Sequence, residues 1–225
     1  MDPIDHIKYL GMYIDNHLNW NHDIVQLSKK LSRANKIFSK LRHNVPLEYC
    51  IKVYSALFHS HLSYGCSLWG LTTNESIKKI EILQKKSVRI LTFSDADAHS
   101  NPLFIQLNIV KVIDLIKLNQ LKLTYRFYAS SLPTDLQSLS KFSCDVHTTN
   151  LCLNSARKNL LYIPRINSVS YGNKSLRYQC PAIWNKTVKH GIELGPVKIP
   201  LDKIHNVNHF SKILKKHFLH SYSLL

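Results

Sequence analysis

Residues 22–42 carry the strongest folding signal in this sequence. Apolar side chains recur there at steps of three and four residues, which form one stripe on a helix of 3.6 residues per turn; they are Ile24, Leu27, Leu31, Ala34, Phe38 and Leu41. Four cations recur in the opposite arc, at Lys29, Arg33, Lys36 and Lys40. The pattern predicts an amphipathic helix with a buried face and a cationic ridge. Glycine is scarce, with 6 in 225 residues, which also favours helices because tight turns often need glycine.

Three further helices are predicted before residue 132. Residues 47–69 are apolar on nearly all faces, which is typical of a helix buried between neighbours, and Gly65 is expected to bend or end it. Residues 74–92 repeat the amphipathic pattern, with a cap at Thr73 or Asn74. Their predicted basic face consists of Lys78, Lys79, Lys85, Lys86 and Arg89, with Ile82 as an exception among them. Residues 104–130 are predicted to form one long helix.

The two ends of the chain show weaker patterns. Residues 7–14 are predicted to form one short strand, in which Gly11 marks a bulge or a close backbone approach. After about residue 134 the periodicity weakens, and short helices are expected at 175–188 and 207–220, joined by a linker at 191–200. The sequence therefore predicts a mainly α fold.

The net charge of +16 directs attention to polyanionic partners. Phosphate contacts dominate nucleic-acid affinity, so nucleic acid is the first candidate, an anionic membrane surface is the second, and a plain solvated surface is the alternative. Five cysteines without a C-x-x-C spacing favour a reducing compartment over a disulfide framework. The sequence shows no signal peptide and no apolar run near ~20 residues, so we expect an intracellular protein, nuclear or cytoplasmic, without a membrane partner.

Several segments occur in an order that is met in a known family. They are I-K-Y-L-G-M-Y-I-D at 7–15, Y-S-A-L-F-H-S-H-L-S-Y-G-C-S-L-W-G at 54–70, L-Q-K-K-S-V-R-I-L at 83–91, N-S-A-R-K-N-L at 154–160 and S-L-R-Y-Q-C-P-A-I-W-N at 175–185. In this order they resemble the strand after the palm, the aromatic thumb helix, the basic helix and the late Trp-Asn segment of reverse transcriptases from non-LTR retrotransposons of the jockey or CR1 kind.

The resemblance implies an organisation and a role. The expected domains are a remnant strand and turn from the end of the palm at 1–20, a thumb-like helical bundle at 21–132, and a less regular basic region with short helices at 133–225. Because such polymerases carry their metal-binding aspartates before Y-L-G, we expect the fingers and most of the palm to be absent. The chain alone is then expected to bind nucleic acid without polymerising it, while the parent polymerase would work in target-primed reverse transcription.

Chemistry-bearing residues give no catalytic or metal site in the sequence. Asp95 and Asp97 stand in a polar loop and are interpreted as turn residues rather than ligands of two metal ions. His205 and His209 have i, i+4 spacing, but the glutamate of a zinc-protease motif is missing. The spacing of a further trio matches no common zinc module: Cys144, His147 and Cys152. We therefore predict no catalytic residue, no metal and no cofactor.

The expected binding residues lie on the two basic helices and in the tail. Phosphate contacts are predicted at Lys29, Arg33, Lys36, Lys40, Lys78, Lys85, Lys86 and Arg89. The resemblance implies a primer-supporting strand at Tyr9, Leu10 and Gly11. Base stacking is a candidate role, with ordinary packing as its alternative, for Tyr162, Arg165, Tyr171 and Arg177.

The predicted partner is RNA or an RNA–DNA hybrid. The polymerase palm, or a second copy of this chain, is a further candidate partner through the apolar 47–69 helix, because such a surface is sticky when it is exposed. The alternatives to a nucleic-acid-binding fragment are a protein-interaction or structural module and a non-functional relic of a mobile element.

Overall fold

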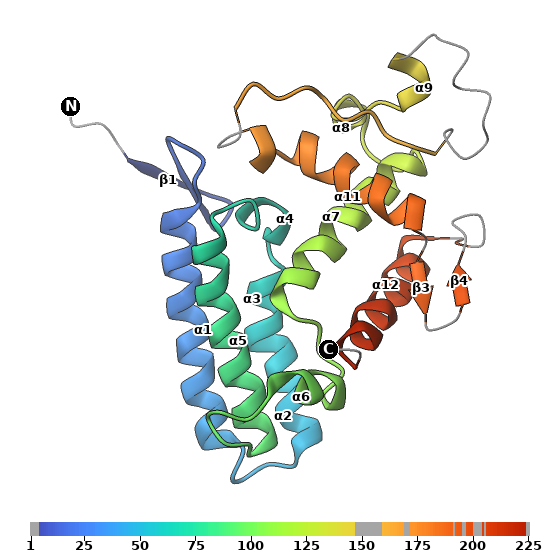
Figure 1. The fold of residues 1–225 in the computed structure, drawn as a ribbon. Coiled ribbons are helices and arrows are strands. Elements are labelled where there is room, and N and C mark those ends of the chain that lie inside the picture. The colour runs from blue at the N-terminus through green and yellow to red at the C-terminus, as the bar shows by residue number, and fades with distance from the viewer. Residues whose placement is uncertain are drawn as a thin grey trace. The chain divides into compact units, whose positions relative to one another are not determined.

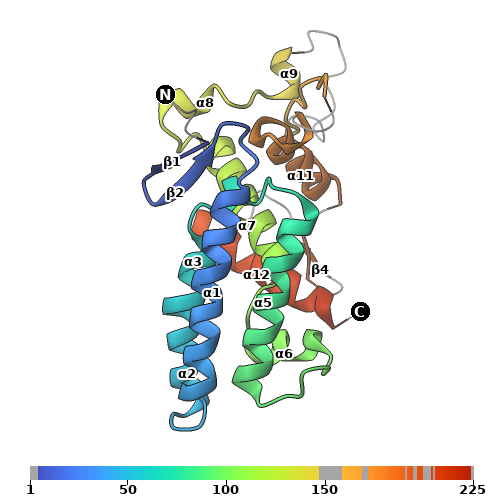
Figure 2. The ribbon, with the colours of Figure 1, turned by 90° about the vertical axis from the view of Figure 1, so that its left-hand side faces the viewer.

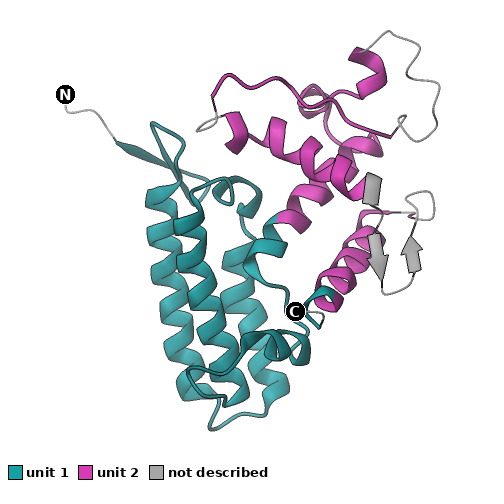
Figure 3. Cartoon of the chain, in the orientation of Figure 1, with its two compact units in different colours: residues 1–116, 221–225 teal, residues 117–220 magenta. Residues whose placement is uncertain are grey.

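The fold is mainly helical, so the predicted class is confirmed (Figure 1). A computed structural model describes residues 5–146, 159–168, 172–190, 192–194, 197–199, 204 and 206–223. The chain divides into two compact units, residues 1–116 with 221–225 and residues 117–220 (Figure 3). The division falls inside a continuous helix and so does not locate a domain boundary. The predicted domain limits stay a prediction.

The first unit begins with a β-hairpin. Strands β1 (His6–Tyr9) and β2 (Met12–Asp15) pair antiparallel, with Tyr9 opposite Met12. Leu10 and Gly11 turn the chain with φ angles of 46° and 84°. Two consecutive positive φ angles suit a two-residue hairpin because their twist matches that of the strands. The prediction of a single strand over 7–14 was wrong, since Gly11 takes the turn and not a place within a strand.

Two long helices run side by side and parallel in this unit (Figures 1 and 2). They are α1 (Asn21–Leu41) and α5 (Asn74–Thr92), which confirm the helices predicted at 22–42 and 74–92. Buried polar groups fix their register. The Asn35 side-chain amide donates to the Leu83 carbonyl at 3.0 Å, and the Ser87 hydroxyl donates to the Asn35 amide oxygen at 2.5 Å.

The start of α5 follows the predicted capping. The Thr73 hydroxyl accepts a hydrogen bond from the Ser76 backbone N–H at 3.4 Å, which satisfies one of the free N–H groups of the first turn. The Ser76 hydroxyl in turn lies 3.5 Å from the Asn21 amide oxygen of α1. The two helix N-termini are therefore linked directly.

Residues 47–69 form the predicted helix, which contains a π-helical turn and is interrupted at Tyr64 and Gly65. The segments are α2 (Leu47–Tyr54), the π-helical turn η1 (Ser55–His59), α3 (Ser60–Ser63) and α4 (Cys66–Trp69). A π-turn holds more residues than an α-turn, so it keeps side chains four apart on the core face; these are Tyr54, Phe58 and Leu62. The prediction of burial on nearly all faces was wrong, because Tyr49, Leu57, Tyr64 and Leu68 are exposed.

The bend predicted at Gly65 is confirmed. Gly65 has φ +61°, and a β-carbon there would lie 2.4 Å from the sulfur of Met12 in β2. Tyr64, just before it, donates its hydroxyl hydrogen to the Leu10 carbonyl at the hairpin tip. Trp69 is buried and donates its indole N–H to the Tyr64 carbonyl at 3.0 Å. The Tyr-Gly pair thus fastens the hairpin to the helices.

A break separates α6 (Ser100–Gln106) from α7 (Val112–Tyr128), so the prediction of one helix over 104–130 was wrong. The fully buried Gln84 of α5 satisfies the broken backbone. Its amide N–H donates to the Val110 carbonyl at 2.9 Å, and its amide oxygen accepts from the Val112 N–H at 2.7 Å. Apolar periodicity alone does not reveal this break, because the groups that stabilise it come from another helix.

The second unit holds the short elements of the tail. They are the C-terminal part of α7, α8 (Thr134–Gln137), α9 (Ser143–Val146), the 3-10 turn η3 (Gly172–Lys174), α11 (Leu176–His190), β3 (Ile192–Leu194), β4 (Val197–Ile199) and most of α12 (Val207–Tyr222). The helices predicted at 175–188 and 207–220 are confirmed. The segment predicted as a linker at 191–200 contains the strands β3 and β4, which pair antiparallel.

The Trp-Asn pair of the late segment is a packing device. The buried Trp184 donates its indole N–H to the Asn159 carbonyl at 2.9 Å. The Asn185 side chain bonds both backbone groups of Leu161, accepting from its N–H at 2.8 Å and donating to its carbonyl at 2.7 Å. An Asn side chain therefore stands in for a neighbouring strand and holds the segment around Leu161 against α11.

The last residues of α12 belong to the first unit. The Lys111 N–H donates to the Tyr222 hydroxyl oxygen at 3.1 Å, and that hydroxyl donates to an Asp114 carboxylate oxygen at 2.7 Å. The Lys111 ammonium lies 4.1 Å from the centre of the Tyr222 ring. Burial and the neighbouring Asp114 carboxylate raise the pKa of the Tyr222 hydroxyl. The tyrosine therefore remains a neutral hydrogen-bond donor at neutral pH.

Candidate nucleic-acid interface

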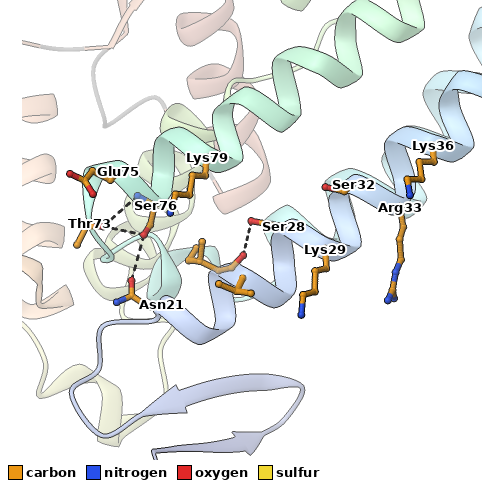
Figure 4. A pocket seen from close by; sticks show the side chains of 12 residues that line it. Asn21, Ser28, Lys29, Ser32, Arg33, Lys36, Thr73, Glu75, Ser76 and Lys79 are labelled. Atoms are coloured by element: carbon orange, nitrogen blue, oxygen red, sulfur yellow. Dashed lines mark hydrogen bonds between the residues drawn. The ribbon is translucent and has the colours of Figure 1, made fainter.

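A basic groove lies between α1 and the first turns of α5 (Figure 4). Its volume is about 790 Å³. Four of its lining residues are cations, namely Lys29, Arg33 and Lys36 from α1 and Lys79 from α5, and one, Glu75, is a carboxylate. Polar groups that can meet phosphate oxygens complete much of the wall; they are Asn21, Ser28, Ser32, Thr73 and Ser76. The lining is thus cationic and rich in hydroxyls.

The α1 wall follows directly from the helical period. Leu27, Leu31 and Phe38 are buried on one face, so the cations three and four residues apart emerge from the other. All four members of the predicted ridge are exposed: Lys29, Arg33, Lys36 and Lys40. Their Cα atoms span about 16 Å along the axis, taking 1.5 Å rise per residue. The geometry leaves these cations free to follow a chain of phosphates, and the binding role itself stays a prediction.

The predicted cations of α5 do not act as one row. Lys78 and Lys86 are exposed. Lys85 forms an ion pair with Glu81 at 2.7 Å, and the Arg89 guanidinium donates to the Ala98 carbonyl at 3.0 Å. These two side chains therefore already have partners inside the unit. The structure does not bring the four α5 cations into the groove.

Lys79 and the hydroxyls are the groove residues that we did not predict as a site. Lys79 was recognised only as part of a basic face. Its place in the groove depends on the parallel register of α1 and α5, which Asn35 sets through bonds to residues about 50 positions later. The apolar periodicity of one helix does not reveal how that helix aligns with its neighbour.

The Y-L-G tip is exposed. Tyr9 and Leu10 keep 63% and 74% of their surface open to solvent, and Gly11 takes the second position of the turn. The Leu10 carbonyl accepts a hydrogen bond from the Tyr64 hydroxyl, which fastens the tip to the helices. The side chains of Tyr9 and Leu10 nevertheless remain mostly in solvent. The primer-supporting role stays a prediction.

The predicted stacking residues of the tail are only partly described. Tyr171 lies outside the described residues. Arg165 and Arg177 are exposed, and Tyr162 is half-buried, with its backbone N–H donating to the Lys141 carbonyl at 2.8 Å. The structure does not bring these side chains into one site, and their stacking role stays a prediction.

Ionisable groups near the groove include two with shifted pKa values. Burial raises the pKa of Asp23, while a hydrogen bond from the Tyr13 N–H at 3.0 Å and the nearby side chains of Lys30 and His22 oppose that rise. Partial burial lowers the pKa of His61, and Lys30 lowers it further. His61 therefore carries less positive charge near neutral pH than a free imidazole does.

Within the described part of the chain, no three His, Cys, Asp or Glu side chains come together as metal ligands would. Three of the residues considered for zinc, His147, Cys152 and His205, lie outside the described residues. Asp95 and Asp97 are exposed in the loop before α6, and the Ala98 N–H donates to the Asp95 carbonyl at 3.2 Å. Among the same described residues, no helix is long and apolar enough to cross a membrane.

Known proteins match this chain over up to about half of its length. Over 112 residues, 48% of the chain, it is 27% identical to a probable RNA-directed DNA polymerase from the transposon X-element of Drosophila melanogaster. The chain is a relative of retrotransposon reverse transcriptases. RNA-directed DNA polymerases from the mobile element jockey match at 23% identity over 49% of the chain in Drosophila funebris, and at 27% over 36% in Drosophila melanogaster.

The predicted resemblance to non-LTR retrotransposon reverse transcriptases is confirmed by these matches. The matched stretch spans only 9–12% of the length of the mobile-element polymerases. No protein-family model and no solved structure matches the chain.

Proposed function

We propose that this chain is a nucleic-acid-binding part of a retrotransposon RNA-directed DNA polymerase, and that it binds the sugar–phosphate backbone of an RNA–DNA hybrid in the groove between α1 and α5. In this proposal the helices of the first unit from α1 onward belong to the thumb of the polymerase, and the catalytic aspartates belong to a palm outside this sequence. The relationship to mobile-element polymerases, whose names give an RNA template and a DNA product, supports the choice of ligand.

The single observation that carries the proposal is the groove itself. Three cations from one helix and a fourth from its neighbour line a cavity of about 790 Å³ that has a single carboxylate in its lining. Side chains that meet phosphates position a duplex and do not read its sequence. The lining contains no aromatic residue on which a base could stack. Binding in the groove should therefore be independent of sequence and strongly dependent on salt.

The test measures the affinity for a labelled blunt RNA–DNA hybrid across a salt series. The variant replaces Lys29, Arg33, Lys36 and Lys79 by glutamine. Each phosphate contact contributes about 0.7–0.9 to the slope of log affinity against log salt. Loss of all four contacts should lower that slope by about 3. The affinity of the variant should also fall at low salt.

A matched control removes the same charge elsewhere. It replaces four exposed cations of the second unit by glutamine, namely Arg126, Lys186, Lys212 and Lys216. If the groove makes the phosphate contacts, the control should keep most of the wild-type slope. A general electrostatic field would instead weaken both variants alike. Equal slopes for the wild type and the groove variant would rule out the groove as the binding surface.

A further inference from the structure

An exposed aromatic ring lies at the C-terminal ends of α1 and α5, the two helices that form the basic groove. Phe93, just after α5, leaves 57% of its surface in solvent. The Arg42 guanidinium, just after α1, lies over its ring at 4.4 Å from the centre, and the His43 ring meets it edge-on at 5.4 Å. A large apolar ring thus stands in water with a guanidinium over its face.

The backbone at Phe93 is in an unfavourable conformation. Its φ is +55°, in the left-handed region, where helices usually end on glycine because a β-carbon crowds the following carbonyl. A bulky residue at positive φ is an outlier, and such outliers concentrate at functional sites. The strain at Phe93 is not offset by burial, since most of the ring is exposed.

The neighbours of Phe93 hold the guanidinium in place. Arg42 donates from one terminal nitrogen to the Ile90 carbonyl at 3.0 Å, and from Nε to His43 Nε2 at 3.2 Å. These bonds keep the cation against the ring. Aromatic rings flanked by guanidinium groups are the surfaces on which unpaired bases stack.

Phe93 also lies at the C-terminal ends of the two helices that form the groove, where Arg42 contacts it. From Lys29 to Arg42 the α1 axis advances about 20 Å, at 1.5 Å per residue. A strand whose phosphates follow Lys29, Arg33, Lys36 and Lys40 along α1 ends within one helical turn of Arg42, which lies over the ring. Asp95 and Asp97 follow in the same loop and disfavour phosphates on their side, so the strand approaches the ring from α1.

We infer that Phe93, with Arg42 behind it, is a stacking site for an unpaired base of the nucleic-acid strand that leaves the groove. This site rests on the proposed function, and it adds the class of ligand: a hybrid with a single-stranded extension rather than a blunt one. Stacking tolerates every base because each has a π-face, so the site carries no sequence preference.

The test compares two labelled probes, a blunt RNA–DNA hybrid and the same hybrid with a single-stranded RNA extension that carries 2-aminopurine. Phe93→Gly should weaken binding of the extended probe about tenfold, the usual effect of losing one stacked base. It should leave the blunt probe unchanged and abolish the quenching of 2-aminopurine. Phe93→Trp should retain tight binding and quenching.

Stability separates this role from packing. Glycine relieves the positive φ, so Phe93→Gly should melt at or above the wild-type temperature. The loss of affinity that Phe93→Gly causes for the extended probe should not change with salt, because stacking releases no counterions. If Phe93→Gly lowers the melting temperature, or binds the extended probe as tightly as the wild type does, the stacking site is refuted.

The outcomes distinguish this site from the groove. If the glutamine variant of the groove binds the blunt probe like the wild type while Phe93→Gly still loses the extension, the groove proposal fails and the stacking site stands. If the groove variant weakens but Phe93→Gly changes nothing, the stacking site fails alone. If the wild type binds neither probe, both are overturned.

Discussion

Replacing Gln84 by leucine removes the side chain that satisfies the break between α6 and α7. The Val110 carbonyl and the Val112 N–H are buried and take their hydrogen bonds from this one amide. The same amide lies 3.3 Å from the buried Tyr54 hydroxyl. Leucine has a similar volume and no polar atom, so it leaves the cavity filled and the backbone groups without partners.

The magnitude follows from those orphaned groups. A buried donor or acceptor that loses its partner costs about 1–3 kcal/mol. Two such groups give a range of about 2–6 kcal/mol, and the added apolar contacts of leucine offset part of it. We expect Gln84→Leu to lower the free energy of unfolding of the first unit by about 3 kcal/mol.

Urea unfolding measures that loss, and amide hydrogen exchange at Val112 locates it. About 3 kcal/mol corresponds to roughly 100-fold faster exchange through opening of the break. The matched control is Gln106→Leu, the same substitution at an exposed residue of α6, which should change stability by less than about 0.5 kcal/mol. If Gln84→Leu costs no more than Gln106→Leu, the assignment of Gln84 as the stabiliser of the break is wrong.

Gln84→Glu gives a second readout through pH. An ionised carboxylate accepts from the Val112 N–H but cannot donate to the Val110 carbonyl, whereas the protonated acid does both. Burial should raise the pKa of this glutamate in the folded state above its unfolded value of about 4.3. The folded state then holds the proton more tightly. The destabilisation should be fully present above the folded pKa and should disappear as the pH falls to the unfolded pKa.

Three further outcomes are expected. Gly70→Ala should cost about 2–3 kcal/mol in thermal melts, because its β-carbon would lie 2.5 Å from the Cys66 carbonyl oxygen and 2.6 Å from Cγ2 of Ile116, and a backbone oxygen cannot easily move away. Asp23 has a raised folded pKa, so the wild type should lose stability as pH rises from 3.8 to that pKa; Asp23→Asn should abolish this slope in urea titrations over pH. Asn185→Ala should cost about 2 kcal/mol and speed hydrogen exchange at the Leu161 amide, whereas an unchanged rate there would contradict the role assigned to this side chain.

Periodicity predicted the helices whose stability is local. Helices α1 and α5 carry a full apolar stripe, so their limits agree with the predicted ones to within a residue. The break before α7 was missed because apolar residues continue through it, and its hydrogen bonds come from Gln84, far away in the sequence. The hairpin at 6–15 was missed because a two-residue turn leaves the alternation of a strand almost undisturbed.

In the candidate site, too, the features set by one helix could be predicted and those set by contacts between elements could not. The ridge on α1 could be predicted because one helix determines which of its side chains face outward. The fourth groove cation, Lys79, depends on how two helices align. The partners of Lys85 and Arg89 also lie in the folded unit, so a count of charges on a helical wheel does not tell which cations remain available.

The position of Tyr222 has a consequence for the order in which the chain folds during synthesis. The groove helices leave the ribosome early, and Gln84 can close the break once residue 112 has emerged. Tyr222 must form hydrogen bonds with Asp114 and Lys111, which precede it by 108 and 111 positions. At ribosomal speeds of about 5–20 residues per second, roughly 5–20 s pass between the synthesis of Lys111 and that of Tyr222. Throughout that interval the Asp114 carboxylate remains without this hydroxyl donor, so the nascent first unit should gain this increment of stability only after Tyr222 has been made.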